Sequence, residues 1–137
     1  MDSFRFHVTQ KRITIYSFVI MSDHFHIIYE VIQPFSNSDI KQSMLGFTSK
    51  EMLRNMTEDE KSLFLVNKRN REFQIWKSPS LSINIFSDKF IFQKINYIHN
   101  NPKQADLVKD NADYKLCSYK SYKDKKNEFD FLTTIRY

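Results

Sequence analysis

The sequence of 137 residues contains one glycine, one cysteine and three prolines. With Gly46 alone, the chain has no glycine-rich loop of the kinds that hold nucleotide phosphates, which argues against nucleotide hydrolysis. With Cys117 alone, it has neither an internal disulfide nor a cysteine-rich zinc site, as is typical of the reducing cytoplasm. No apolar run approaches the roughly 18 residues that span a bilayer, and Asp2 and Arg5 interrupt the N-terminus where a secretory signal would be apolar. We therefore expect a soluble, cytoplasmic protein with no membrane partner.

The residues that are present indicate a folded, mildly basic protein. Apolar residues make up 41% of the chain and aromatic residues 15%, more than a disordered chain carries. The length is sufficient for one hydrophobic core, and we predict a single domain over residues 1–137. The formal net charge of +5, which many soluble proteins share, favours an anionic partner such as nucleic acid.

Two strand-like runs near the N-terminus predict a β-hairpin. Residues 12–20, RITIYSFVI, and residues 24–31, HFHIIYEV, are rich in β-branched and aromatic side chains, and turn-forming polar residues separate them. Regular alternation in the first run places Ile15 and Ser17 on one face and Phe18 on the other.

The second strand-like run carries two histidines separated by one residue. Because alternate side chains of a strand share a face, we expect His24 and His26 to point the same way. Two imidazoles in this arrangement are typical of a metal site, but two histidines on a strand are more often ordinary polar residues. The motif alone leaves both interpretations open.

The middle of the chain predicts a helix followed by shorter elements. An amphipathic helix begins at Ser38 as its N-terminal cap and extends through the following apolar stripe. Residues 57–72 are charged and lack a clean period, so we expect a helix in their first half and a loop in their second. Residues 73–77 and 81–86 predict two short strands separated by the turn signal Ser-Pro-Ser.

A second helix begins at Ser87, where isoleucines recur at helical spacing, and we expect Pro102 to end it. Gln93, Tyr97 and Asn101 follow one another at intervals of four on the face opposite those isoleucines. Because a phenol ionises only near pH 10, a tyrosine attacks phosphorus poorly unless a cation or metal ion polarises the target. Two imidazoles and an amide oxygen could hold such an ion, although a tyrosine on a helix is more often an ordinary surface or packed residue.

Two segments of the chain resemble the HUH single-tyrosine transposases, in particular their REP-associated branch. Residues 19–31, VIMSDHFHIIYEV, resemble the strand that carries two histidines around one hydrophobic residue. Residues 92–119, FQKINYIHNNPKQADLVKDNADYKLCSY, resemble the block around the catalytic tyrosine. The resemblance covers most of residues 12–122, and the two motifs occur in the order found in the family.

This resemblance implies an α+β fold with a ferredoxin-like antiparallel sheet and helices packed mainly on one face. It implies that His24, His26 and Asn101 are metal ligands and that Tyr97 is the nucleophile. Such an enzyme cleaves single-stranded DNA, forms a 5′-phosphotyrosine and a free 3′-OH, and rejoins strands without ATP. The ion expected from the family is Mg²⁺ or Mn²⁺, whereas imidazoles taken alone favour later divalent metals.

The expected partner is single-stranded DNA that forms a hairpin, and a homodimer is left open. The basic residues expected to contact the DNA are Lys41, Lys50, Arg54, Lys68, Arg69, Arg71 and Lys94. Two other functions fit the same residues. One is a nucleic-acid-binding remnant that does not cut; the other is a metal-dependent hydrolase in which His24 and His26 serve to activate water.

The sequence also departs from the family pattern. Members of the family begin with a strand and a helix before the histidine hairpin, whereas residues 3–10 suffice for the last turns of that helix. We therefore predict a domain that lacks the first strand and most of the first helix. Asp23, Lys103 and Asp106 stand where the family has asparagine, valine and glycine.

Overall fold

The computed structural model describes residues 1–77 and 80–135. Within these residues the protein is α+β, with five α-helices and two separate two-stranded antiparallel sheets. No helix in these two ranges combines the length and the apolarity needed to cross a membrane. In chain order the elements are α1 (Asp2–Thr9), β1 (Ile13–Ile20), β2 (Phe25–Val31), α2 (Asn37–Asn55), α3 (Glu58–Ser62), β3 (Leu65–Lys68), β4 (Arg71–Phe73), α4 (Asp88–Gln104), the 3-10 helix η1 (Asn111–Asp113) and α5 (Tyr119–Lys123).

The chain divides into two compact units, which are described separately. Unit 1 contains residues 1–35 and 84–137, and unit 2 contains residues 36–83. Both units lie within residues 1–137, for which the sequence predicts a single domain.

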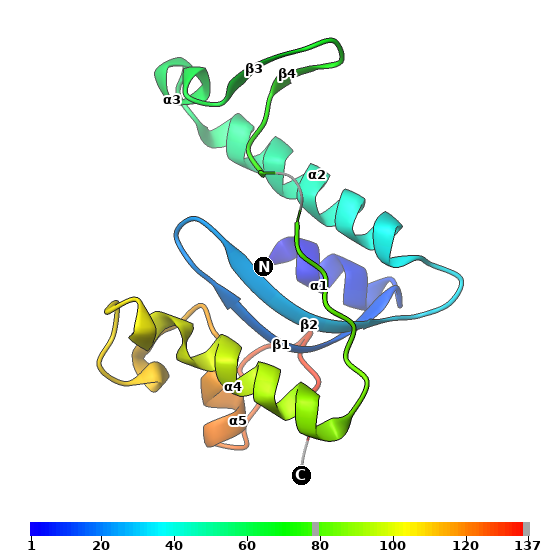
Figure 1. The fold of residues 1–137 in the computed structure, drawn as a ribbon, viewed down its shortest axis with the longest axis vertical. Coiled ribbons are helices and arrows are strands. Elements are labelled where there is room, and N and C mark those ends of the chain that lie inside the picture. Colours follow the sequence, from blue (N-terminus) through cyan, green and yellow to red (C-terminus); the bar gives the residue numbers. More distant parts are fainter. Residues whose placement is uncertain (78–79, 136–137) are drawn as a thin grey trace. The chain divides into compact units, whose positions relative to one another are not determined.

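The predicted hairpin is confirmed in unit 1. Strands β1 and β2 pair antiparallel, from Ile13 opposite Val31 to Ile20 opposite Phe25. The residues before them, expected to form the last turns of a helix, lie in α1. Figure 1 shows α1 and α4 on opposite sides of this hairpin.

A β-bulge at Tyr16 changes which side chains of β1 share a face. The register passes from Ile15 opposite Tyr29 directly to Ser17 opposite Ile28. The extra residue reverses the alternation, so Ile15 shares its face with Phe18 rather than with Ser17. The prediction of one regular alternation through β1 was therefore wrong.

The bulge gives both faces of the hairpin an apolar surface, and a helix covers each. On one face, the ring of Phe4 from α1 packs against Phe18 with 5.7 Å between centroids. On the other, Ile95 and Ile98 of α4 form a buried cluster with Val19 and neighbouring residues. The expectation of helices mainly on one face does not hold for unit 1, because each apolar face must be covered.

The C-terminal part of the chain, to which little structure could be assigned from the sequence, borders the outer edge of β1. The backbone N–H of Ser118 donates to Phe18 O (3.0 Å), and that of Thr133 donates to Ile15 O (2.8 Å). These contacts include single bridges and do not extend into strands, so the described residues form no single four-stranded sheet of the ferredoxin-like kind.

Unit 2 begins with the predicted amphipathic helix, α2. Its N-terminal cap is Ser36 rather than Ser38, because Ser36 and Asp39 form a reciprocal capping box. In residues 57–72, the helix expected in the first half is α3. The second half, where we expected a loop, contributes to the short hairpin of β3 and β4.

The two strands predicted for residues 73–77 and 81–86 do not form; of these residues, Phe73 alone belongs to a strand, at the end of β4. The first segment is held instead by side-chain bonds, since Trp76 Nε1 donates to Thr48 Oγ1 of α2 at 2.9 Å. Two residues of the predicted Ser-Pro-Ser turn, 78 and 79, lie outside the described residues.

Helix α4 begins after its cap Ser87, as predicted, but Pro102 lies inside it and does not end it. Proline lacks the N–H that would bond to the carbonyl of Ile98, four residues earlier. The side chain of Asn101 compensates, because its Nδ2 lies 3.4 Å from Ile98 O. A proline so near the helix end interrupts few bonds, and the helix continues for two more residues.

Candidate active site

The two histidines of the hairpin lie side by side on the face that α4 covers. His24 immediately precedes β2 and His26 is within it, and their ring centroids are 5.2 Å apart. His26 stands opposite Val19, which belongs to the core cluster under α4. Both rings therefore point to the same side of the hairpin, as predicted.

A carboxylate orients the first of these rings. His24 Nδ1 donates to Asp23 Oδ1 at 2.6 Å, which leaves Nε2 as the nitrogen that could bind a metal ion. A carboxylate on the far nitrogen is a common partner of a metal-ligating histidine. Asparagine, which stands at the corresponding position in the family that this segment resembles, also has an acceptor oxygen, so Asp23 offers the same capacity.

The environment of the second ring favours its neutral form. Burial lowers the pKa of His26 below the ordinary histidine value, and the neighbouring His24 lowers it further. A neutral imidazole is the form that binds a metal ion. The ring of His26 is therefore suited, at neutral pH, to act as a nitrogen ligand.

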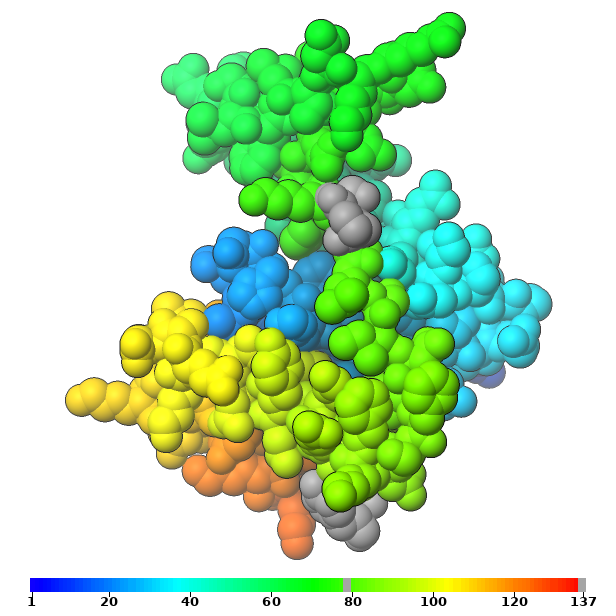
Figure 2. Space-filling view, in the orientation of Figure 1, coloured from blue at the N-terminus to red at the C-terminus, as the bar shows by residue number. Residues whose placement is uncertain are grey.

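Tyr97 approaches the histidines from α4. Its ring centroid lies 5.7 Å from that of His26, and the residue is 50% exposed. Side chains of α4 and of the segment after it lie at the surface of unit 1 in the space-filling view (Figure 2). The fold thus brings together residues from the two segments that the sequence singled out.

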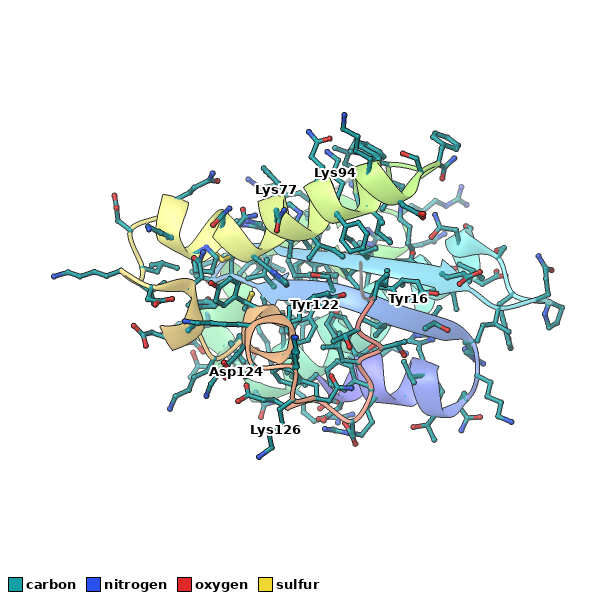
Figure 3. All side chains as sticks on the ribbon, turned by 90° about the horizontal axis from the view of Figure 1, so that it is seen from below. Tyr16, Lys77, Lys94, Tyr122, Asp124 and Lys126 are labelled. Atoms are coloured by element: carbon teal, nitrogen blue, oxygen red, sulfur yellow. The ribbon has the colours of Figure 1, made fainter. Side chains whose placement is uncertain are left out.

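Lys94 adds a positive charge beside the tyrosine. Its Nζ lies 5.7 Å from the centre of the Tyr97 ring and 5.1 Å from that of Phe90, all on α4. Figure 3 labels Lys94 on this helix. An ammonium group here would attract a phosphate that approaches the phenol.

Asn101 lies one helical turn beyond Tyr97 with its amide turned back onto α4. Its Nδ2 donates to Tyr97 O at 2.9 Å, in addition to the contact with Ile98 O, so Oδ1 is the atom that could bind a metal ion. Residues 1–77 and 80–135 contain no group of three or more His, Cys, Asp or Glu side chains that could hold such an ion.

The chemistry of these three donors fits a divalent ion whose remaining coordination positions are filled by the substrate and by water. Two imidazole nitrogens and one amide oxygen leave positions for phosphate oxygens and water, which Mg²⁺ and Mn²⁺ accept readily. His24 and His26 would supply the nitrogens, and Asn101 would supply the oxygen.

Most of the predicted DNA-binding residues lie away from this site in sequence and belong to the other unit. Unit 2 contains Lys41, Lys50, Arg54, Lys68, Arg69 and Arg71, and unit 1 contains Lys94. Three of the six are bonded within unit 2: Lys41 to Ser80 and Ser82, Arg54 to Glu51, and Lys68 to Gln74. Within unit 1, Lys94 lies beside Tyr97.

No role was predicted for a polar cluster that lies beneath α4. His99 is buried with its Nε2 2.8 Å from Ser118 Oγ and 3.2 Å from Ser17 Oγ. The position of His99, two residues from Tyr97 in NYIHNN, was the one available signal. Neither serine lies in a pattern that marks it.

No protein-family model matches the chain, and searches of the curated proteins and of the solved structures find no similar protein. The resemblance to HUH transposases therefore rests on the two sequence motifs.

Proposed function

We propose that this protein cleaves and rejoins single-stranded DNA, as a metal-dependent tyrosine transposase of the REP-associated type. The supporting observation is the meeting of His24, His26 and Tyr97, from segments far apart in the sequence, on one side of the hairpin. His24 is exposed and Tyr97 is half exposed, so neither belongs to the buried core of unit 1, and the arrangement favours chemistry over packing.

In the proposed reaction, Tyr97 Oη attacks the phosphorus of a phosphodiester. The Oη–P bond forms, the P–O3′ bond breaks, the phenolic proton passes to solvent, and the departing oxygen takes up a proton to become a free 3′-OH. A 3′-OH attacking the phosphotyrosine reverses the step and rejoins the strand without ATP. A divalent ion, when bound, would supply Lewis-acid stabilisation of the charge that develops on the phosphate.

The surrounding residues have distinct roles in this proposal. Asp23 holds the ring of His24 through Nδ1 and leaves Nε2 as the nitrogen that could bind a metal ion, while His26 stays neutral. Lys94 would attract the phosphate to Tyr97, and the exposure of the tyrosine leaves the nucleophile open to substrate. The basic residues of unit 2 would contact the rest of a hairpin-forming strand.

The finer fold is part of the same proposal. The segment around Cys117 bridges Val19 in the antiparallel sense along the outer edge of β1. It occupies the place where a further strand of a ferredoxin-like sheet would pair. Under this proposal, β1 and β2 are the part of that sheet that presents the histidines.

A protein that binds single-stranded nucleic acid without cutting is the second candidate. It is favoured by the half-exposed ring of Tyr97 beside Lys94, because an aromatic ring next to a cation can bind a base and a phosphate without cutting the strand. A metal-dependent hydrolase has less support, since Glu30, the carboxylate on the same strand, accepts a hydrogen bond from Tyr16 at 2.6 Å.

The test is a search for DNA covalently attached to the protein. Labelled single-stranded hairpin oligonucleotides are incubated with the protein and Mn²⁺, and products are separated on a denaturing gel. We expect an adduct from the unaltered protein that is lost in Tyr97→Phe, which keeps the ring against His26 but removes Oη, and in His24→Ala. DNA binding without an adduct by the folded protein would support the binding-only candidate instead.

A further inference from the structure

We infer that His99, together with Ser17 and Ser118, is a positioning device that sets the rotation of α4 and so holds Tyr97 against His26. This inference deepens the proposed function and rests on it for its link to catalysis. The geometric part concerns the folded protein and has a test of its own.

The device is a closed triangle of polar atoms. Ser118 Oγ lies 2.8 Å from His99 Nε2 and 3.0 Å from Ser17 Oγ, and Ser17 Oγ lies 3.2 Å from the same nitrogen. Ser118 Oγ also accepts a hydrogen bond from the backbone N–H of Phe18 at 3.0 Å. Three segments, β1, α4 and the start of the C-terminal segment, are therefore joined at one point.

All three residues of the triangle are buried, with exposed fractions of 4% for His99 and 0% for each serine. The rings of Tyr119 and Tyr122 pack edge-on against the imidazole, at 5.5 and 5.2 Å between centroids. Burial lowers the pKa of His99 to about 4, so the ring is neutral at physiological pH. A group so enclosed has no access to substrate, which assigns it a positioning role rather than a catalytic one.

The triangle and the candidate site lie on opposite sides of the same helix. Two residues correspond to a rotation of about 200° around a helix axis, so Tyr97 and His99 project in nearly opposite directions. Ile98 between them points into the core. Rolling α4 in either direction would therefore move Tyr97 relative to β2 at the same time as it moved His99 relative to β1.

The anchoring points on the hairpin are neighbours. Ser17 stands opposite Ile28 and Val19 stands opposite His26, so Ser17 and His26 share the face under α4 and lie on adjacent strands. The bulge at Tyr16 places Ser17 on this face. The same backbone feature therefore brings the serine to His99 and fixes its distance from the metal-binding pair.

Hydrogen bonds can select one rotation of α4, whereas the apolar contacts of this helix cannot. The packing of Ile95 and Ile98 against the core attracts the helix to the hairpin but is non-directional. Hydrogen bonds depend on angle and on distances of a few tenths of an ångström. The triangle therefore selects one rotation from those that apolar packing would allow.

The first measurement is the contact itself. In the unaltered protein, nuclear Overhauser effects between ring protons of His26 and Tyr97 should report their proximity. We expect His99→Phe, which fills the space without polar atoms, to weaken that signal, and His99→Gln, which restores a polar group near the position of Nε2, to recover it. Ile98→Val is the control, because it loosens apolar packing while the triangle stays intact, and it should keep the signal.

The second measurement is the rate of covalent adduct formation with Mn²⁺ and labelled hairpin DNA. Displacement of a nucleophile by about 1 Å lowers a rate on the order of 100-fold, and we expect that loss in His99→Phe with substantial rescue in His99→Gln. If His99→Phe fails to fold, Ser17→Ala takes its place, with the same expected direction in both measurements.

The outcomes separate the inference from the proposed function. An unchanged Tyr97–His26 signal in a folded His99→Phe or Ser17→Ala variant would overturn the inference, whether or not the protein cleaves DNA. Absence of any adduct from the unaltered protein would overturn the proposed function, and the ring contact would then decide the inference alone. A rate in His99→Phe within twofold of the unaltered protein would overturn the catalytic link.

Discussion

The four histidines of this chain fall into two pairs with opposite surroundings. His24 and His26 lie at the turn end of the hairpin, where one ring is bonded to an exposed aspartate and the other faces a half-exposed tyrosine. His7 and His99 are buried, one in α1 and the other in α4. The role of an imidazole therefore depends on the groups around its two nitrogens, and these cannot be read from the residue type.

The buried pair is itself unequal. His99 Nε2 lies within hydrogen-bonding distance of two hydroxyl groups, whereas neither ring nitrogen of His7 has a hydrogen-bond partner among the described residues. A buried polar group without a partner destabilises a fold, while a bonded one specifies it. We therefore expect replacement of these two histidines to have effects of opposite sign.

The largest expected effect is on stability, in His99→Ala. The substitution opens a cavity and removes one hydrogen-bond partner from each of two buried hydroxyl groups, so the free energy of unfolding should fall by about 3 kcal/mol. His24→Ala, at a position near the surface, should change it by less than about 0.5 kcal/mol. Urea denaturation of both variants measures the difference, and equal losses would break the distinction between the two pairs.

The next effect concerns metal affinity and sharpens the account of the exposed pair. Removing the carboxylate that orients His24, in Asp23→Ala, should weaken Mn²⁺ binding roughly 10- to 100-fold. Asp23→Asn keeps an acceptor oxygen and should retain most of the affinity. Isothermal titration calorimetry gives both constants; equal affinity in Asp23→Ala and the unaltered protein would show that the Asp23–His24 bond has no part in metal binding.

A smaller and opposite change is expected for His7→Leu. It removes two unpartnered nitrogens from the interior and should raise the free energy of unfolding by about 1 kcal/mol at neutral pH.

The same variant should also reduce the sensitivity to acid. Burial lowers the pKa of His7, with a further contribution from Arg12, so the unfolded chain binds a proton there at higher pH than the folded one. The stability of the unaltered protein should therefore fall as the pH drops below the ordinary histidine pKa of about 6.5. His7→Leu should flatten this dependence in unfolding curves at pH 7 and pH 5. A steeper dependence in the variant would contradict the assignment.

The smallest expected effect is at the end of α4. Asp106 follows the helix with a φ of 54°, and the backbone N–H of Leu107 donates to Pro102 O at 3.0 Å. Glycine adopts such a conformation without strain, so Asp106→Gly should raise the melting temperature through a gain of about 0.5 kcal/mol. The Tyr97–His26 ring contact should stay unchanged, since the last turn of α4 follows Tyr97 and His99 in the chain.

Local patterns in the sequence were sufficient for the elements that hold the candidate site. Alternation and residue type predicted the hairpin and the shared face of His24 and His26, because both depend on neighbours along a strand. The start of α4 was equally local, since Ser87 caps it through the backbone N–H of Phe90. That Tyr97 meets the histidines could be anticipated from the family resemblance but not from spacing.

What the sequence did not predict depends on contacts between distant residues. Ser118 bonds to β1 through residues about a hundred positions earlier, and no periodicity encodes such a contact. The short hairpin of β3 and β4 contains charged residues that favour a loop by composition, yet it pairs across a two-residue turn. The continuation of α4 beyond Pro102 depends on a hydrogen bond from the side chain of Asn101, which the general preference of proline for helix ends does not take into account.

The bulge at Tyr16 has a consequence for how this chain tolerates insertions and deletions. Its carbonyl accepts a hydrogen bond from Tyr122 at 2.6 Å, and its hydroxyl donates to Glu30 (Figure 3 labels both tyrosines). Because Tyr16 is the extra residue of the bulge, its loss would leave Ile15 opposite Tyr29 and Ser17 opposite Ile28 in a regular ladder. Tyr16 thus marks a position at which β1 can lose one residue without exchanging its two faces, although the hydrogen bonds that Tyr16 makes to Tyr122 and Glu30 would be lost.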